Sequence, residues 1–159
     1  MIPTMLPILR YLSLFASIIG IDVVTKRWAL AACQQEVFWT PFVSCQVTRN
    51  RGIAWGMFHA QSMMPFILVT TSVALIMVIL SWHLVHQWRA GHSIIGEVCV
   101  LAGASANMID RLVYAGVIDF IALGYGEYTW PLFNIADVAV VCGVLLMVMK
   151  SMQIHEEKM

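Results

Sequence analysis

Residues 65–88 read PFILVTTSVALIMVILSWHLVHQW, and this stretch decides the class of the fold. It contains no Asp, Glu, Lys or Arg. A helix needs about 20 predominantly apolar residues to cross the hydrocarbon core of a bilayer. The stretch is therefore predicted to form a membrane-spanning helix.

Three further stretches of the same kind lie around it, at about residues 6–31, 94–114 and 133–152. Together the four predict an all-α polytopic membrane protein with four transmembrane helices. No repeat or low-complexity segment is present, so residues 1–159 are expected to form a single membrane domain. In the long connection 32–64, β-branched and aromatic residues around 38–47 predict a small extramembrane β-element. The connection 115–132 is predicted to be a functional loop.

The composition agrees with a membrane protein. The chain is 60% hydrophobic and 11% charged, whereas a soluble domain has roughly 45–50% apolar and about 25% charged residues. Nine basic and nine acidic residues balance without a basic tract, so nucleic acid is not an expected partner. Four cysteines are too few for a disulfide framework, and spacing alone leaves the pairing of Cys33 with Cys45 open.

Alternation of four spans places polar residues from distant segments at one membrane surface. The surface is shared by the end of the first span, the end of the third, the start of the fourth and the connection 115–132. The residues expected there are Asp22, Lys26, Asn107, Asp110, Arg111, Asp119, Asn134 and Asp137. No comparable cluster is expected at the opposite end of the helices.

Most of these groups have a structural interpretation as well as a functional one. Asp22 and Lys26 have the i, i+4 spacing of a helical ion pair, which would fix the end of the first span. Asn107, Asp110 and Arg111 share one helix face and fit structural and substrate-binding roles equally well. The small residues 102–106 before them favour close helix packing, or leave room for a substrate helix.

Asp119 and Asp137 differ because neither has a basic residue within four positions. Two carboxyl groups that are held together cannot both ionise, so one keeps a proton. An aspartic protease uses this state: the ionised carboxylate takes a proton from water while its protonated partner stabilises the oxyanion. The same acids also fit a proton or ion pathway, and a structural subunit whose polar pairs join helices is a further alternative.

Other motifs lack the residues that their chemistry requires. His83 and His86 form H-x-x-H without the Glu of a zinc-protease helix, and are predicted to give the second span a polar end. Residues 124–127, GYGE, are predicted to form a turn. Residues 30–33, LAAC, are similar to a lipoprotein cleavage site, but charges precede them, so the first span is expected to be retained.

Four blocks of sequence, taken in order, resemble bacterial lipoprotein signal peptidases, the type II signal peptidases of the aspartic peptidase class. The resemblance extends over nearly the whole chain. The blocks are residues 22–26 (DVVTK), 50–56 (NRGIAWG), 107–111 (NMIDR) continuing to 116–120 (GVIDF), and 133–137 (FNIAD).

The resemblance implies a membrane-embedded aspartyl endopeptidase that removes signal peptides from bacterial prolipoproteins, cutting before the diacylglyceryl-modified cysteine. It implies a catalytic pair of Asp119 and Asp137. It also implies substrate-binding or supporting roles for Asn50, Asn107, Arg111 and Asn134, with Asp22, Lys26 and Asp110 behind them. We expect no cofactor and no metal, and a monomer in the inner membrane that has cytoplasmic termini and its site near the outer face.

Three positions depart from the family pattern: Val23, Ala106 and Val138. None of them removes a carboxylate, so the departures concern the range of substrates more than the chemistry. The orientation comes from the resemblance, because the positive charges do not decide it. Four lie on the terminal side of the membrane and five on the other.

Overall fold

The computed structural model describes residues 5–52, 63–125 and 128–156. Its four helices are α1 (Met5–Ala32), α2 (Met63–Arg89), α3 (Ile95–Tyr114) and α4 (Ile135–Glu156). Its four strands are β1 (Val37–Thr40), β2 (Val43–Asn50), β3 (Val117–Tyr125) and β4 (Tyr128–Phe133). The expected segment 53–56 of the second sequence block, and residues 126–127 of the expected turn, lie outside the described residues.

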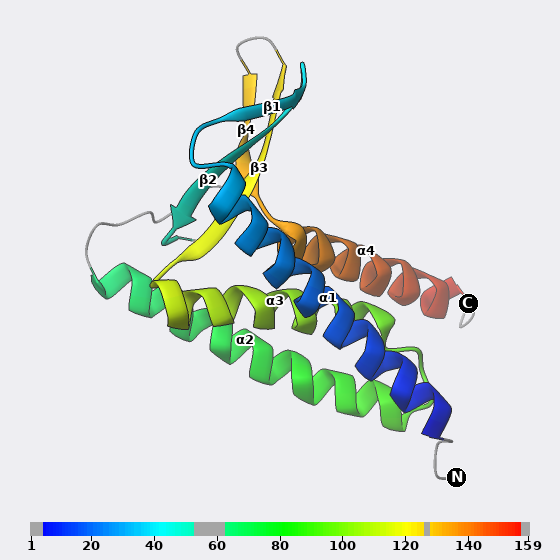
Figure 1. Ribbon diagram of the computed structural model, residues 1–159. Coiled ribbons are helices and arrows are strands. Elements are labelled where there is room, and N and C mark those ends of the chain that lie inside the picture. The colour runs from blue at the N-terminus through cyan, green and yellow to red at the C-terminus, as the bar shows by residue number, and fades with distance from the viewer. Residues whose placement is uncertain (1–4, 53–62, 126–127, 157–159) are drawn as a thin grey trace.

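The helices form a layer with the sheet at one end of it (Figure 1). α3 is the central helix and packs against α1, α2 and α4. α1 begins, and α4 ends, at the end of the layer farthest from the sheet (Figure 1). Successive helices therefore run in opposite directions, which brings the end of α1, the end of α3 and the start of α4 close to the sheet.

Three of the described helices, α1, α2 and α4, are long and apolar enough to cross a membrane. α3 has 20 residues but is more polar, and it is the most buried of the four. Its buried polar residues are Glu97, Asn107, Asp110 and Arg111. The expectation of a largely helical membrane protein is thus confirmed, with three candidate spans instead of four. α3 carries more polar residues because it packs against the three other helices.

Glycines allow α3 and α4 to pack closely. A Cβ atom on Gly143 would lie 2.7 Å from the backbone oxygen of Gly96, and one on Gly103 would meet the backbone oxygen of Ala136. Ala102 and Ala106 in the same stretch of α3 are buried. Gly103, within the small residues 102–106, therefore serves the contact between the two helices.

The sheet is antiparallel, with the order β1-β2-β3-β4. β1 and β2 confirm the β-element predicted in the first long connection. β3 and β4 correct the prediction for residues 115–132, which form half of the sheet instead of a loop. β2 supplies a partner for β3, since Thr48 pairs with Asp119 and Asn50 with Val117. Because β4 extends to Phe133, the last helix begins at Ile135, slightly later than predicted.

A disulfide joins Cys33, just after α1, to Cys45 in β2. The pairing that the sequence left open is therefore present. Both cysteines are buried in one apolar cluster with Ala29 and Phe120. The end of α1 is thereby fixed against the sheet.

One expectation about the opposite end of the helices is wrong. Glu97 near the start of α3 is buried there, and its Oε1 lies 3.5 Å from Nε2 of His83 and 3.5 Å from Nζ of Lys150. These residues belong to three different helices and are far apart in sequence. The cluster was missed because only the packing of α2, α3 and α4 brings them together.

Candidate active site

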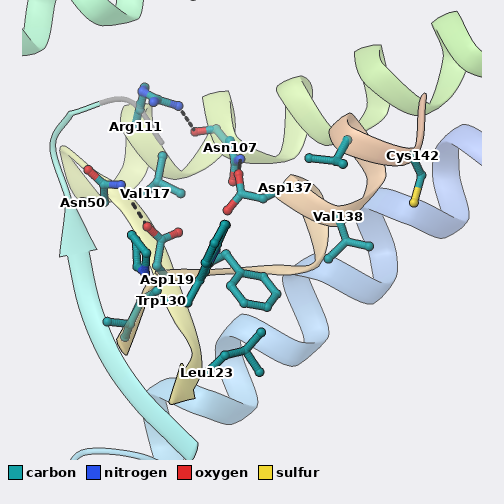
Figure 2. A pocket seen from close by; sticks show the side chains of 14 residues that line it. Asn50, Asn107, Arg111, Val117, Asp119, Leu123, Trp130, Asp137, Val138 and Cys142 are labelled. Carbon is teal, nitrogen blue, oxygen red and sulfur yellow. Dashed lines mark hydrogen bonds between the residues drawn. The ribbon is translucent and has the colours of Figure 1, made fainter. Parts of the chain in front are cut away.

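Asp119 and Asp137 line one cavity of about 460 Å³ beside the sheet (Figure 2). Asp119 belongs to β3 and is 2% exposed. Asp137 lies in the first turn of α4 and is half-buried. Both carboxyl groups face this cavity, although the two residues lie in different elements and far apart in the sequence.

Each oxygen of Asp119 accepts one hydrogen bond from an asparagine. The Nδ2 atom of Asn134 donates to Oδ1 at 2.7 Å, and Nδ2 of Asn50 donates to Oδ2 at 3.0 Å. The pKa of Asp119 is raised to about 7, first by burial and then by the nearby charge of Asp137, although the hydrogen bonds from Asn50 and Asn134 lower it. This carboxyl group therefore exchanges its proton near neutral pH.

Asp137 is held by the cap of its own helix. Its backbone N–H donates to Oδ1 of Asn134 at 2.9 Å, and the backbone N–H of Asn134 donates to Oδ2 of Asp137 at 3.1 Å. This reciprocal pair is a capping box, with Asn134 as N-cap and Asp137 three residues later. The other oxygen, Oδ1, accepts from Nδ2 of Asn107 at 2.9 Å. The capping box therefore holds Asp137 in place through residues close to it in sequence, and Asn107 of α3 donates one further hydrogen bond to it.

Asn134 connects the two acids directly. Its side-chain amide reaches Asp119, and its backbone N–H reaches Asp137. The same amide also donates to Oδ1 of Asn107 at 3.2 Å and to the carbonyl of Ile118 at 3.3 Å. Asn134 is fully buried. Its position therefore couples the placement of the strand acid to that of the helix acid.

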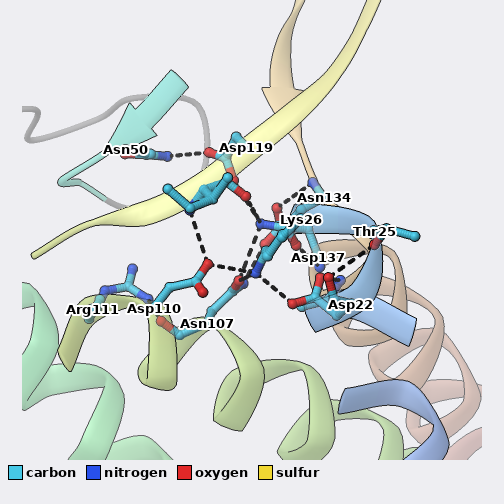
Figure 3. A network of polar contacts seen from close by, with 12 residues as sticks. Asp22, Thr25, Lys26, Asn50, Asn107, Asp110, Arg111, Asp119, Asn134 and Asp137 are labelled. Atoms are coloured by element: carbon cyan, nitrogen blue, oxygen red, sulfur yellow. Dashed lines mark hydrogen bonds and ion pairs between the residues drawn. The ribbon is translucent and has the colours of Figure 1, made fainter. Parts of the chain in front are cut away.

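Lys26 is the centre of a buried polar network behind the cavity (Figure 3). Its Nζ lies 2.6 Å from Oδ2 of Asp22, 2.8 Å from Oδ2 of Asp110 and 2.8 Å from Oδ1 of Asn107. The predicted pair of Asp22 and Lys26 is therefore present, as part of a larger network that joins α1 to α3. These two residues and Asp110 support the site without lining the cavity.

Both acids of this network also bind backbone N–H groups of neighbouring elements. Oδ1 of Asp22 accepts from Ala136 at 2.8 Å, which satisfies a free donor at the start of α4. Oδ2 of Asp110 accepts from Ile118 at 3.0 Å, next to Asp119 in β3. The network thus sets the positions of both elements that carry the cavity acids.

Arg111 and Asn50 line the cavity on the side of the first connection. The Nη2 atom of Arg111 donates to the carbonyl of Gly52 at 3.1 Å, and the backbone N–H of Gly52 donates to Oδ1 of Asn50 at 2.8 Å. Nε of Arg111 is buried without a hydrogen-bond partner within residues 5–52, 63–125 and 128–156. The guanidinium therefore keeps donor capacity close to the two acids.

The walls of the cavity are mostly apolar, and the sequence did not point to them. They come from β3, β4 and one face of α4: Val117, Leu123, Trp130, Pro131, Leu132, Phe133, Val138, Val141 and Cys142. The sequence signal for these walls is the stretch 128–132 (YTWPL), which contains two aromatic residues and lies directly before FNIAD. Among the departures from the family pattern, Val138 lines the cavity, whereas Ala106 is buried elsewhere in α3.

No group of three or more His, Cys, Asp or Glu side chains within the described part of the chain is arranged to hold a metal ion. The site consists of two carboxyl groups that line one cavity, accept hydrogen bonds from amide donors and are surrounded by mostly apolar walls. Such an arrangement suits the activation of a water molecule against a peptide bond.

Three relatives of this chain carry the name lipoprotein signal peptidase. The chain is 35% identical over 140 residues to the lipoprotein signal peptidase of Anaplasma marginale (strain Florida), with 87% of this chain and 81% of the relative covered. It is 35% identical over 147 residues to that of Aquifex aeolicus (strain VF5), with coverages of 88% and 84%. For the lipoprotein signal peptidase of Azoarcus sp. (strain BH72), the identity is 32% and the coverages are 98% and 90%.

Solved structures agree with the fold. A bacterial membrane enzyme solved by the in meso method at 2.3 Å resolution superposes with a TM-score of 0.73 and 26% identity, covering 94% of this chain and 92% of the other. A second such enzyme, solved at 1.9 Å, gives a TM-score of 0.68 and 27% identity, with coverages of 89% and 91%. The profile of peptidase family A8, signal peptidase (SPase) II, matches residues 14–153. From this match and these relatives, the chain belongs to the signal peptidase II family.

Proposed function

We propose that this protein is a membrane aspartyl endopeptidase that removes signal peptides from prolipoproteins, with Asp119 and Asp137 as its catalytic pair. One observation carries the assignment of the pair. The two carboxyl groups line the same cavity, and Asn134 bonds to both of them. Membership of the signal peptidase II family supports the substrate class.

The proposed reaction needs one proton shared between the two acids. The ionised carboxylate accepts a proton from the attacking water, while the protonated carboxyl donates its proton to the carbonyl oxygen of the scissile bond. When the resulting diol collapses, the C–N bond breaks, the protonated carboxyl donates its proton to the leaving nitrogen, and the ionised carboxylate takes the proton of one diol hydroxyl. One proton is therefore again left on the pair. A pKa of about 7 for Asp119 suits this exchange at neutral pH.

The neighbouring amides and the guanidinium complete the site. We assign to Asn107 and Asn134 the positioning of the acids, because their hydrogen bonds fix three of the four carboxyl oxygens. Asn50 fixes the fourth. Arg111 has donors close to the cavity, and we assign it to contacts with the backbone of the substrate.

We also propose four membrane-crossing helices, with α3 as the fourth. α3 lies between the other helices, and its buried side chains Asn107 and Asp110 bond to groups inside the protein instead of facing lipid.

We further propose an orientation in which the sheet end of the protein faces the outside of the inner membrane. The disulfide between Cys33 and Cys45 supports this, because disulfides persist in oxidising compartments. Both termini would then be cytoplasmic.

The apolar cavity walls suit a lipid-modified substrate. Val138, Val141 and Cys142 extend the lining of the cavity along α4, one of the helices apolar enough to cross a membrane. A signal helix would lie between spans with its acyl chains in lipid, and the bilayer would deliver the scissile bond to the acids. We propose that one chain, acting as a single-domain monomer without a cofactor, is sufficient.

The test uses D119N and D137N, each assayed separately on a lipid-modified precursor in detergent. Each variant is expected to retain its fold and lose at least about a thousandfold in kcat/KM. The single carboxyl group that remains cannot accept a proton from water and donate one to the scissile carbonyl in the same step. E36Q removes an acid that bonds to Ser44 outside the cavity, and is expected to keep wild-type activity.

Three outcomes would contradict the proposal. Full cleavage by either Asn variant would remove the pair from the mechanism. Acid-dependent ion flux in liposomes without precursor cleavage by the wild type would indicate an ion pathway. Failure of both Asn variants to assemble, with a wild type that cleaves nothing, would indicate a structural subunit.

A further inference from the structure

A second cavity, of about 400 Å³, lies at the end of the helices opposite the catalytic pair. It is formed by the last turns of α2, the first turn of α3 and the last turns of α4. Its polar lining comprises His83, Gln87, Glu97, Lys150 and Ser151. None of these residues takes part in the proposed cleavage.

Glu97 is the buried group of this cavity, and it has few partners. The residue is 1% exposed. Its Oε1 has contacts of 3.5 Å with His83 and Lys150, at the long end for ion pairs. Its Oε2 has no hydrogen-bond partner among the residues that the structure describes. A buried carboxylate in this state is costly, so a bound ligand that brings N–H donors would be stabilised there.

The basic side chains, Lys150 and His83, lie nearer the rim of the cavity than Glu97 does. Lys150 donates to the carbonyl of Ser93 at 2.7 Å and to Oε1 of Gln87 at 3.2 Å, which holds its charge in place. Its side chain is 22% exposed, and that of His83 is 41% exposed. A positive charge and an imidazole at this position would attract an anionic phosphate.

One wall of the cavity is apolar. It consists of Val144, Met147 and Val148 on α4. Val144 and Val148 are 45% and 51% exposed on a helix that is apolar enough to cross a membrane. The cavity therefore presents a buried carboxylate, a cationic rim and a lipid-facing wall, which match an amine, a phosphate and an acyl chain.

We propose that this cavity binds phosphatidylethanolamine, with the ammonium group of the lipid donating to Glu97 and its phosphate near His83 and Lys150. The carboxylate of Glu97 and the ammonium of Lys150 sum to zero charge, which suits a zwitterionic headgroup better than one with a net negative charge. This site is independent of the cleavage chemistry, because it lies at the other end of the helices.

The test measures lipid binding to the purified full-length protein in detergent by native mass spectrometry. Phosphatidylethanolamine, phosphatidylcholine and phosphatidylglycerol with identical acyl chains are titrated. Phosphatidylethanolamine is expected to bind about tenfold more tightly than phosphatidylcholine, because the choline group has no N–H to donate to a carboxylate. Phosphatidylglycerol is expected to bind more weakly than phosphatidylethanolamine.

The variant E97Q is expected to reduce the preference for phosphatidylethanolamine over phosphatidylcholine to less than about twofold. The matched control E36Q removes an acid near the sheet and is expected to keep the tenfold preference. Equal affinities in the wild type, a preference that survives in E97Q, or tightest binding of phosphatidylglycerol would each overturn the proposal.

A second variant covers the case in which E97Q does not fold. S151W leaves Glu97 in place and fills the mouth of the cavity from an exposed position. It is expected to abolish the preference, and a preference retained in S151W would also overturn the proposal. Since precursor cleavage is measured separately, loss of the lipid site and loss of the peptidase activity are distinguishable.

Discussion

Asn134 has two separable tasks, since it caps α4 and also donates a hydrogen bond to Asp119. N134A is expected to lose about 1 kcal/mol of stability from the cap and at least about tenfold in kcat/KM. N134S restores a capping side chain that is too short to reach Asp119. It is therefore expected to recover the stability without the activity.

The pH profile of cleavage distinguishes an effect of Asn134 on Asp119 from its effect on the stability of the protein as the cap of α4. The bond from Asn134 lowers the pKa of Asp119, so its removal is expected to move the pH limb that reports this acid to higher pH in both variants. A profile that does not move in N134A and N134S would show that Asn134 acts only as a helix cap.

Asp119 should also make the stability of the protein depend on pH. Its pKa of about 7 in the fold is above the unfolded value of about 3.9, so the fold favours the protonated carboxyl. The stabilisation is complete below pH of about 4 and is lost as the pH rises through about 7. Relative to D119N, the wild type is expected to lose about 1.4 kcal/mol per pH unit in this window. Thermal unfolding from pH 5 to pH 8 measures the difference, and the opposite slope would contradict a raised pKa of Asp119 in the fold.

At the scale of residues, the sequence identified the acids but not their contacts. Asp119 and Asp137 stood out because neither had a nearby base. Two of the asparagine donors to their oxygens depend on the pairing of β2 with β3 and of α3 with α4. Asn50 is 69 positions from Asp119 in the sequence, and Asn107 is 30 positions from Asp137. No spacing rule reaches across such separations.

The contact between α3 and α4 is the element-scale feature on which the site depends, since these helices carry Asn107 and Asp137. G143A is expected to destabilise the protein by about 1–3 kcal/mol, because the new Cβ would meet backbone atoms of Gly96 and Val100 that cannot move independently. Thermal unfolding measures the effect.

Gly20 in α1 provides the matched control. Nothing lies within 4 Å of a Cβ added there, so G20A is expected to be neutral or to stabilise by up to about 1 kcal/mol through helix propensity. If G143A unfolded at the same temperature as G20A, the close approach of α3 and α4 would not be a structural constraint.

The helices could be predicted from the sequence more fully than the strands. Four apolar stretches gave four helices, because helical contacts are local and membrane spans have a fixed length. β3 and β4 were missed because glycines, a proline and acids interrupt their pattern, and because β3 is paired with β2 from another connection. The cluster around Glu97 was missed for the same reason, since three helices build it.

The whole molecule has one polar site at each end of a helical layer. α1 begins and α4 ends at the end opposite the sheet (Figure 1). The balanced positive charges left the orientation undecided, but the disulfide near the sheet favours an oxidising compartment on that side.

A reporter fused to the C-terminus tests this orientation. A green fluorescent protein is expected to be bright there and an alkaline phosphatase inactive, because the C-terminus would lie in the cytoplasm. An active phosphatase and a dark fluorescent protein would reverse the proposed orientation.

The most direct measurement of the central proposal is an experimental structure of the protein with a peptide-like inhibitor that carries a hydroxyl group in place of the scissile carbonyl. If Asp119 and Asp137 form the catalytic pair, that hydroxyl will lie within about 2.6–3.2 Å of an oxygen of each carboxyl group, in the cavity beside β3 and α4. An inhibitor bound elsewhere, or a hydroxyl that contacts neither carboxyl, would contradict the proposal.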